Sequence, residues 1–199
     1  MIPTDVAKSY DHIAERWNSD SLPRNNGIDQ HERAIDFVKE KRAALDVGCG
    51  GSGRIIDLLL SRGFNVEGLD LSARMIESAR QCHPKVILHQ ADICDWELPK
   101  KYHLIAAWDS IWHVPLSSQE AVLAKILQGL TSGGVCIFTT GGLDAPSEKV
   151  DAAMGVPMYY SVLGIPRTLE LIAKNGCVCR HLEYDQYPES HLCVIAQRA

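Results

Sequence analysis

The sequence predicts an α/β fold with a mostly parallel sheet between layers of helices. Between residues 43 and 139, five apolar runs of strand length alternate with segments whose apolar residues recur at helical spacing. A glycine-rich turn follows the first run, and an aspartate stands at the end of four runs: Asp46, Asp70, Asp92 and Asp109. In an open α/β sheet such ends share one edge, where ligands bind. We therefore expect a ligand site at that edge.

Two helices are expected before the sheet begins. Residues 3–17 and 29–40 have helical apolar spacing, and the polar residues between them are typical of a turn. Tyr10 and Trp17 lie on the first helix, where aromatic residues commonly pack against neighbouring turns.

The first strand, helix and second strand form the most informative unit of the chain. The strand at 43–47 runs into a G-x-G-x-x-G turn that starts at Gly48, a spacing that lets backbone amides approach a ligand. A helix follows at 52–62, and the strand at 64–69 leads to Asp70. An acid about twenty residues after the first glycine is placed to accept hydrogen bonds from a ribose. The unit therefore predicts an adenosine-containing ligand.

Asp46 indicates which of the adenosine-containing ligands known for such units this chain binds. In dinucleotide-binding domains, the helix N-terminus after the turn takes up a negatively charged pyrophosphate. A carboxylate two residues before Gly48 would repel that group, but it would suit a ligand with an ammonium or sulfonium cation. The residue therefore favours S-adenosylmethionine over a nicotinamide dinucleotide.

The later elements continue the alternation up to the fifth strand. We expect a helix at 72–82, strands at 85–90 and 102–108, a helix at 117–130 and a strand at 134–139. Residues 141–165 have poor periodicity, and a stretch of that length is typical of a lid or binding loop. A helix at 166–176 and strands at 177–184 and 191–197 complete the chain. A dinucleotide domain would instead end with a sixth parallel strand.

Several motifs occur in the order known from one enzyme family. The turn from Asp46 to Gly53, the Asp92-Ile93 pair after the third strand, and Leu-Thr-Ser-Gly-Gly at 130–134 resemble motifs of the class I S-adenosylmethionine-dependent methyltransferases. The resemblance covers about residues 9–140, and the hairpin-like ending adds to it. It implies a single domain over residues 1–199, with a three-layer α/β/α Rossmann-like methyltransferase fold. Its seven-stranded sheet would have the order 3-2-1-4-5-7-6, with strand 7 antiparallel.

The resemblance also implies which residues bind S-adenosylmethionine and its product S-adenosylhomocysteine. Asp70 would hold the ribose, Asp92 the adenine amino group and Ile93 the adenine ring, while residues 1–40 would form a helical cover over the methionine end. The full set is Tyr10, Trp17, Asp46, Gly48, Cys49, Gly50, Gly53, Asp70, Leu71, Met75, Asp92, Ile93, Trp108 and Asp109. For Tyr10 and Trp17 the alternative is packing within the helix, and for Asp109 it is stabilisation of its loop.

Methyl transfer from a sulfonium is a direct displacement, so catalysis depends mainly on alignment of the reactants. A general base is needed only where the acceptor must lose a proton, and His113, just past the fourth strand, is the candidate. The alternative for His113 is a capping or packing role. In some quinone-biosynthesis members of the family, Glu-His binds a metal at this place. This chain has Trp112-His113, so no metal is carried over.

The methyl acceptor is expected to contact the loop after the fourth strand and the lid. The candidates are Trp112, Met158, Tyr159 and Tyr160, and packing of the lid is the alternative role for the last three. His191, which opens the final strand, is a weaker candidate that could equally be a surface histidine.

The amino-acid composition limits the classes of molecule that we expect the protein to bind. The net charge of −5 gives no electrostatic footprint for nucleic acid or an anionic membrane, and no apolar run is long enough to span a bilayer. Seven cysteines, an odd number, without a signal-peptide pattern favour the cytoplasm. Cys177 and Cys179 share one face of a strand, as packing residues rather than metal ligands. We expect a monomer or homodimer that acts on a small molecule.

Two other functions remain open from the sequence. One is a sensor or partner subunit that binds the cofactor without catalysis. The other, an NAD-dependent oxidoreductase, is disfavoured by Asp46 and by the lack of a Tyr-x-x-x-Lys or similar hydride-transfer motif.

Overall fold

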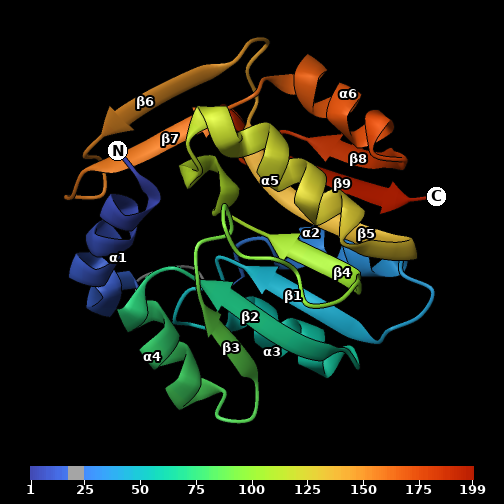
Figure 1. Ribbon diagram of the computed structural model, residues 1–199, viewed down its shortest axis with the longest axis horizontal. Coiled ribbons are helices and arrows are strands. Elements are labelled where there is room, and N and C mark those ends of the chain that lie inside the picture. The colour runs from blue at the N-terminus through green and yellow to red at the C-terminus, as the bar shows by residue number, and fades with distance from the viewer. Residues whose placement is uncertain (18–24) are drawn as a thin grey trace.

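The computed structural model describes residues 1–17 and 25–199, and of Trp17 only the backbone. The strands are β1 Ala43–Val47, β2 Asn65–Asp70, β3 Ile87–Gln90, β4 Tyr102–Ala107, β5 Leu130–Gly141, β6 Ser147–Asp151, β7 Met158–Val162, β8 Cys177–Glu183 and β9 His191–Arg198. The α-helices are α1 Pro3–Trp17, α2 Ile28–Asp36, α3 Arg54–Ser61, α4 Ala73–Cys82, α5 Leu116–Gln128 and α6 Ile165–Lys174, and η1 Ile111–His113 is a short 3-10 helix. Figure 1 shows the sheet with α5 on the near side and α2 and α3 on the far side.

The main sheet has seven strands in the order β3-β2-β1-β4-β5-β9-β8. Pairing is parallel from β3 to β5, while β9 runs antiparallel to both of its neighbours. With β8 and β9 as the sixth and seventh strands, the predicted order and the antiparallel last strand are confirmed.

Alternate residues of the strands feed two apolar cores, one on each face of the sheet. On β1, the buried Leu45 packs in the core that α5 and α6 cover. Its neighbour Ala44 packs in the core that α2 and α3 cover. Strands buried on both faces are typical of a parallel sheet with helices on each side, and this explains their continuous apolar sequences.

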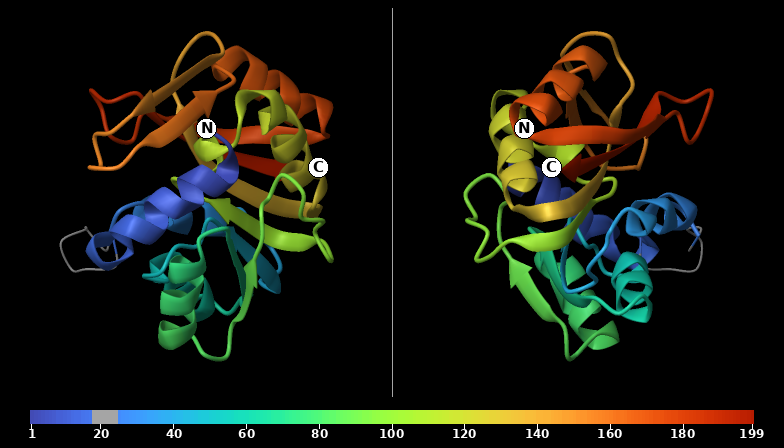
Figure 2. Two further views of the ribbon diagram at one scale, coloured as in Figure 1. Left: turned by 60° about the vertical axis from the view of Figure 1, so that its left-hand side comes forward. Right: turned by 90° about the vertical axis from the view of Figure 1, so that its right-hand side faces the viewer.

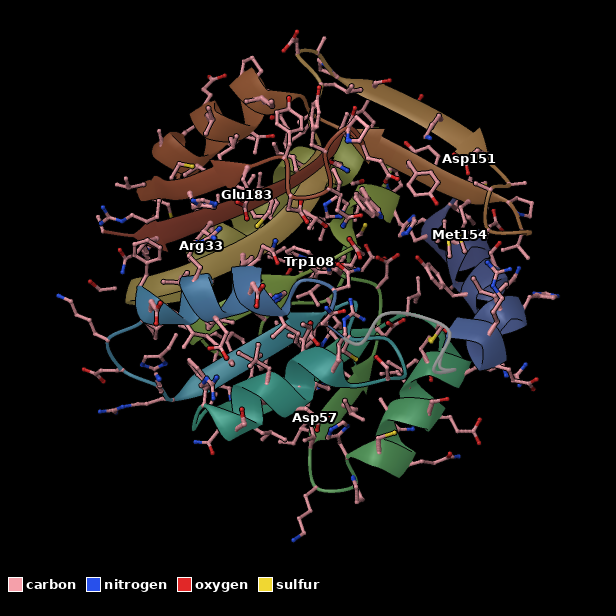
Figure 3. The ribbon with its side chains drawn as sticks, turned by 180° about the vertical axis from the view of Figure 1, so that it is seen from behind. Arg33, Asp57, Trp108, Asp151, Met154 and Glu183 are labelled. Carbon is pink, nitrogen blue, oxygen red and sulfur yellow. The ribbon has the colours of Figure 1, made fainter. Side chains whose placement is uncertain are left out.

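Helix α2 ends four residues before the predicted boundary at 40. The N–H groups of Phe37 and Val38 bond the carbonyls three residues back, and this tighter turn ends the helix while both side chains still pack toward the core. The apolar spacing therefore continued past the helix. Arg33 on α2 forms an ion pair with Glu183 on β8, 2.8 Å apart, which Figure 3 shows from behind.

Part of the predicted loop over 141–165 is instead a β-hairpin. β6 pairs antiparallel with β7, from Ser147 opposite Val162 to Asp151 opposite Met158. β6 is exposed over nearly its whole length and carries no apolar alternation, so the sequence held no strand signal there. The hairpin lies beside α1, with Met158 packed against Val6 and Ile13 (Figure 2).

The cysteines of β8 pack as expected. Cys177 lies in the core under α5 and α6, and Cys179 packs against the same core. Over residues 1–17 and 25–199, every helix is too short or too polar to cross a bilayer.

Candidate functional site

The glycine turn after β1 brings backbone amides to the carboxyl edge of the sheet. Gly48 and Gly50 have φ angles of +73° and +60°, which other residues rarely adopt. The amides of Gly48 and Cys49 both donate to the carbonyl of Leu69, at 2.7 and 3.0 Å. A Cβ on Gly48 would lie 2.2 Å from the Cβ of Ser110. Only glycine at 48 therefore lets the turn pass this closely to the loop after β4.

Asp70, at the end of β2, closes the turn from the opposite side. Its Oδ2 accepts a hydrogen bond from the Gly50 amide and its Oδ1 one from the Ser72 amide, each at 2.9 Å. Burial raises the pKa of Asp70, although these backbone hydrogen bonds act in the opposite direction. Each carboxylate oxygen keeps a second lone pair, so Asp70 can still accept hydrogen bonds from two ligand hydroxyls.

Asp46 on β1 is a buried carboxyl group. Its side chain is 2% exposed, and in the part of the chain that the structure describes no group donates to it. Burial raises the pKa of Asp46 to about 7, against the opposing effect of the Arg54 cation. A buried carboxylate costs free energy unless a cation compensates it. The site therefore suits a cationic ligand.

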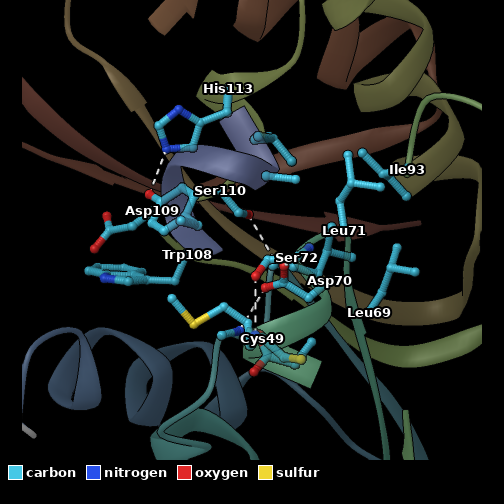
Figure 4. Close-up of a pocket in the computed structure, with 18 of the residues that line it drawn as sticks. Cys49, Leu69, Asp70, Leu71, Ser72, Ile93, Trp108, Asp109, Ser110 and His113 are labelled. Carbon is cyan, nitrogen blue, oxygen red and sulfur yellow. Dashed lines mark hydrogen bonds between the residues drawn. The ribbon is translucent and has the colours of Figure 1, made fainter. Parts of the chain in front are cut away.

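These residues line a first cavity of about 1040 Å³, its open mouth included. It contains twelve of the fourteen residues predicted to bind the cofactor: Tyr10, Asp46, Gly48, Cys49, Gly50, Asp70, Leu71, Met75, Asp92, Ile93, Trp108 and Asp109. Figure 4 shows Trp108 and Asp109 on one side of the cavity and Ile93 on the opposite side. Acid, glycine and apolar residues from five chain segments thus converge as the sequence predicts.

Two of the fourteen are not among the cavity residues. Gly53 lies outside it as the N-cap of α3, where a Cβ would come 2.1 Å from Cε1 of His83. Its glycine is explained by that close packing and by its φ of +64° rather than by ligand contact. The side chain of Trp17 lies outside the described residues.

The cavity also has wall residues that the sequence argument missed. The polar ones are Ser52, Arg54, Ser72 and Ser110. Ser72 could have been found as the N-cap of α4, because its hydroxyl accepts a hydrogen bond from the Met75 amide. The same hydroxyl donates to Asp11 of α1 at 2.6 Å, and so ties the N-terminal helix over the site.

His113 lies at one end of the cavity in a defined tautomer. Its Nδ1 lies 2.7 Å from the carbonyl of Tyr159, which can only accept, so Nδ1 carries the proton. Nε2 accepts from the Tyr10 hydroxyl at 2.9 Å and from the Trp112 indole at 3.1 Å. Burial lowers the pKa of His113 to about 4. At neutral pH it is therefore an uncharged imidazole that accepts two hydrogen bonds.

A second cavity, of about 1450 Å³ with its open mouth, adjoins the first under the β6–β7 hairpin. The two share three wall residues, Tyr10, Asp109 and His113, which we call the shared wall. Of the residues predicted to contact the acceptor, Trp112 and Tyr160 line the second cavity.

Met158 and Tyr159 do not line it. Met158 is fully buried against α1. Tyr159 points to the other side of the hairpin, where its hydroxyl accepts from the Leu116 amide and donates to Glu148. Alternation along a strand separates Tyr159 from Tyr160, and the strand itself was not predicted.

Asp109 of the shared wall is the first of three charged side chains in a row, followed by His191 and Asp185. His191 donates from Nε2 to Asp109 at 2.8 Å and from Nδ1 to Asp185 at 2.6 Å. Burial alone would lower the pKa of His191, but the two carboxylates raise it above its ordinary value. An imidazole that donates from both nitrogens is an imidazolium. In the described part of the chain, no group of three or more His, Cys, Asp or Glu side chains converges on a metal position.

Comparison with known proteins identifies similar chains. Residues 44–134 match the family model described as a methyltransferase domain. The dTDP-3-amino-3,6-dideoxy-alpha-D-glucopyranose N,N-dimethyltransferase of Streptomyces fradiae is 31% identical over 134 residues, which cover 63% of this chain and 51% of that protein. The chain thus spans about half the length of that curated relative.

Two further similarities extend over most of the chain. A ubiquinone biosynthesis O-methyltransferase of Nitrosomonas europaea is 29% identical over 191 residues, covering 87% of this chain and 73% of that protein. The structure of S-adenosylmethionine-bound CalS10, an amino pentose methyltransferase from Micromonospora echinaspora, shares the fold. Its TM-score is 0.68 at 16% identity, over 94% of this chain and 96% of that one. By its methyltransferase domain at residues 44–134, its relatives and its fold, the chain is similar to the class I S-adenosylmethionine-dependent methyltransferases.

Proposed function

We propose that the protein transfers a methyl group from S-adenosylmethionine to a nucleophilic atom of a small-molecule acceptor. The observation that carries the proposal is the pair of cavities that meet at the shared wall. One has the acids and glycines suited to the donor, and the other has room for an acceptor. Two reactants bound on either side of one short boundary are held in the proximity that a direct displacement requires.

In this proposal the donor cavity would provide a separate contact for each part of S-adenosylmethionine. Asp70 would accept hydrogen bonds from the ribose hydroxyls, and Asp92 with Ile93 would contact the adenine. Asp46 would compensate the cationic methionine end. When bound, the sulfonium supplies an electrophilic methyl group and a neutral thioether leaving group.

The shared wall would align the acceptor. For a hydroxyl acceptor, His113 is the candidate base because its Nε2 carries no proton. The Tyr10 hydroxyl and the Trp112 indole both donate to this nitrogen, so they must release its lone pair before it can take up the acceptor's proton. With a pKa of about 4, His113 would be a weak base. An acceptor that needs no base would leave these hydrogen bonds in place, and His113 would then position Tyr10 and Trp112.

Calorimetry distinguishes the donor from the nicotinamide alternative. We expect S-adenosylmethionine and S-adenosylhomocysteine to bind with one site each, and NAD to give no heat of binding. Binding of NAD without any response to the two sulfur ligands would refute the proposal.

Catalysis needs its own experiment, because a cofactor-binding sensor would pass the calorimetric test. The protein is incubated with S-adenosylmethionine and a panel of amines, phenols, carboxylic acids and thiols, and release of S-adenosylhomocysteine is measured. Turnover with one class is expected. A silent panel together with tight cofactor binding would favour a sensor or partner subunit.

A further inference from the structure

The second cavity has a distinct chemical character. Its described walls include four carboxylates, Asp109, Glu148, Asp151 and Glu189, against two cations, Lys149 and His191. Both cations are already compensated. Lys149 lies 2.8 Å from Asp151, and His191 lies between Asp109 and Asp185. An anionic acceptor would therefore meet an excess of negative charge and, among the described wall residues, no uncompensated cation.

Asp109 is the carboxylate that reaches the shared wall. Its Oδ1 accepts from His191 at 2.8 Å and from the Thr139 hydroxyl at 3.3 Å, and its own amide donates to Thr139 at 2.8 Å. Its φ of +52° is unusual for a residue other than glycine. A strained backbone conformation held by three hydrogen bonds to two residues indicates that the position of this carboxylate is fixed.

The second oxygen of Asp109 retains capacity to accept a hydrogen bond. Among the described residues, Oδ2 has only the Asn26 amide, at the long distance of 3.4 Å. Asp185 accepts a hydrogen bond from the other nitrogen of His191 and so fixes the imidazole ring. The ring in turn orients the Asp109 carboxylate through Oδ1 alone. A donor group that enters the second cavity next to the shared wall meets this oxygen.

The aromatic wall of the same cavity already accommodates an ammonium group. Nζ of Lys149 lies 5.2 Å from the centroid of the Tyr160 ring. Trp112 and His113 stand edge to face or tilted against Tyr160, with centroids 6.1 and 5.0 Å away. Aromatic faces next to a carboxylate attract cations.

From this geometry we infer that the methyl acceptor carries an amine, which Asp109 holds by a hydrogen bond at the shared wall. The inference rests on the proposed function and specifies its acceptor. A neutral amine uses its own lone pair to form the N–C bond while the S–C bond breaks and its electron pair remains on sulfur. The methylammonium product then loses a proton to solvent. An amine that binds as an ammonium ion first loses one proton to solvent, and the neutral form then attacks, so His113 Nε2 keeps the two hydrogen bonds that it already accepts.

The test compares three probes of one shape. Benzylamine, benzyl alcohol and benzoate are titrated into the protein, with and without saturating S-adenosylhomocysteine, and binding is followed by calorimetry. Benzylamine is expected to bind at least about tenfold more tightly than benzoate, because its ammonium group forms a charge-assisted hydrogen bond with Asp109 whereas the carboxylate of benzoate meets the excess negative charge of the cavity. Equal or tighter binding of benzoate would overturn the inference.

Variants locate the contact. Asp109→Asn should weaken benzylamine binding about tenfold or more and change benzyl alcohol binding little. Lys149→Gln removes the resident ammonium from Tyr160 and should strengthen benzylamine binding. Because the Lys149 side chain is 68% exposed, that variant tests the inference even if Asp109→Asn does not fold. Glu77→Gln, an exposed charge change on α4 outside both cavities, is the control.

The outcomes separate the two proposals. If the unaltered protein does not bind S-adenosylhomocysteine, the proposed function is refuted. The amine titration of the free protein would still test whether the second cavity prefers an amine. Unchanged benzylamine affinity in both Asp109→Asn and Lys149→Gln would overturn the amine inference and leave the methyltransferase proposal intact.

Discussion

At the scale of single residues, burial determines the charge that each site group carries. Burial raises the pKa of Asp46 to about 7, while it lowers the pKa of His113 to about 4 and so keeps that imidazole neutral. His191 is also buried, yet its two carboxylate neighbours raise its pKa above the ordinary value. The two cavities therefore combine an acid that titrates near neutral pH, Asp46, with a neutral imidazole, His113, and with an imidazole that donates from both nitrogens, His191.

The raised pKa of Asp46 predicts pH-dependent binding of the donor. A carboxyl group whose pKa lies near 7 is mostly protonated at pH 6 and mostly ionised at pH 8, and only the ionised form attracts a cation. Affinity for S-adenosylmethionine should therefore rise about tenfold from pH 6 to pH 8. In Asp46→Asn the pH dependence should vanish, which calorimetry at both pH values measures. A variant with the same slope as the unaltered protein would assign the dependence to another group.

Removing the carboxylate of Asp70 tests its contact with the ribose. Asp70→Ala should weaken S-adenosylhomocysteine binding by on the order of 1–3 kcal/mol, because ligand hydroxyls lose their partner. Since Asp70 also holds the Gly50 amide, the unfolding temperature must be measured on the same samples. Full affinity in a folded variant would show that Asp70 is not a ligand contact.

His113→Ala separates chemistry from cofactor binding. Turnover should fall, by roughly a hundredfold if His113 acts as a base and by less if it only positions Tyr10 and Trp112. Affinity for S-adenosylhomocysteine should change little. Steady-state kinetics beside calorimetry measures both, and an unaltered rate would leave His113 with a packing role alone.

At the scale of elements, the strands and helices that carry strong periodicity could be predicted, and the exposed ones could not. β1, β2, β4 and β5 are largely buried on both faces, so their apolar runs identify them directly, whereas the edge strand β3 is partly exposed. β6 is exposed and charged, and pairs with β7 through its backbone. For that reason Tyr159 and Met158 could not be separated from Tyr160 as cavity residues. The row behind Asp109 also escaped prediction, because Asp185 precedes β9 and approaches His191 only through the turn between β8 and β9.

Tyr159 is one of the side chains that anchor the β6–β7 hairpin to α5, beside Gln119, which bonds Ser161 of β7. The hydroxyl of Tyr159 accepts from the Leu116 amide at 3.0 Å and donates to Glu148 at 2.6 Å. Tyr159→Phe should lower the free energy of unfolding by about 1 kcal/mol and speed hydrogen exchange in the hairpin. Tyr187→Phe, at a side chain 83% exposed, is the matched control. Equal exchange in both variants would show that the anchor is dispensable.

At the scale of the whole molecule, ligand binding should be visible as stability. The first cavity takes its walls from α1, the glycine turn and the ends of the central strands, so a bound ligand joins segments that are distant in sequence. S-Adenosylhomocysteine at a hundred times its Kd should raise the free energy of unfolding by about 2.7 kcal/mol. Thermal melts should then shift upward by roughly 5–10 °C for a chain of this size. A shift with NAD in place of S-adenosylhomocysteine would contradict the donor assignment.

The position of Tyr10 gives α1 a part in the timing of turnover. The helix roofs the first cavity, is tied to α4 through Asp11 and Ser72, and contributes Tyr10 to the wall of the second cavity. Lifting α1 to exchange the donor would therefore also dismantle the boundary against which an acceptor is held. For the proposed reaction we therefore expect an ordered sequence in which the donor enters first, the acceptor enters and leaves while the helix is docked, and the spent donor departs last.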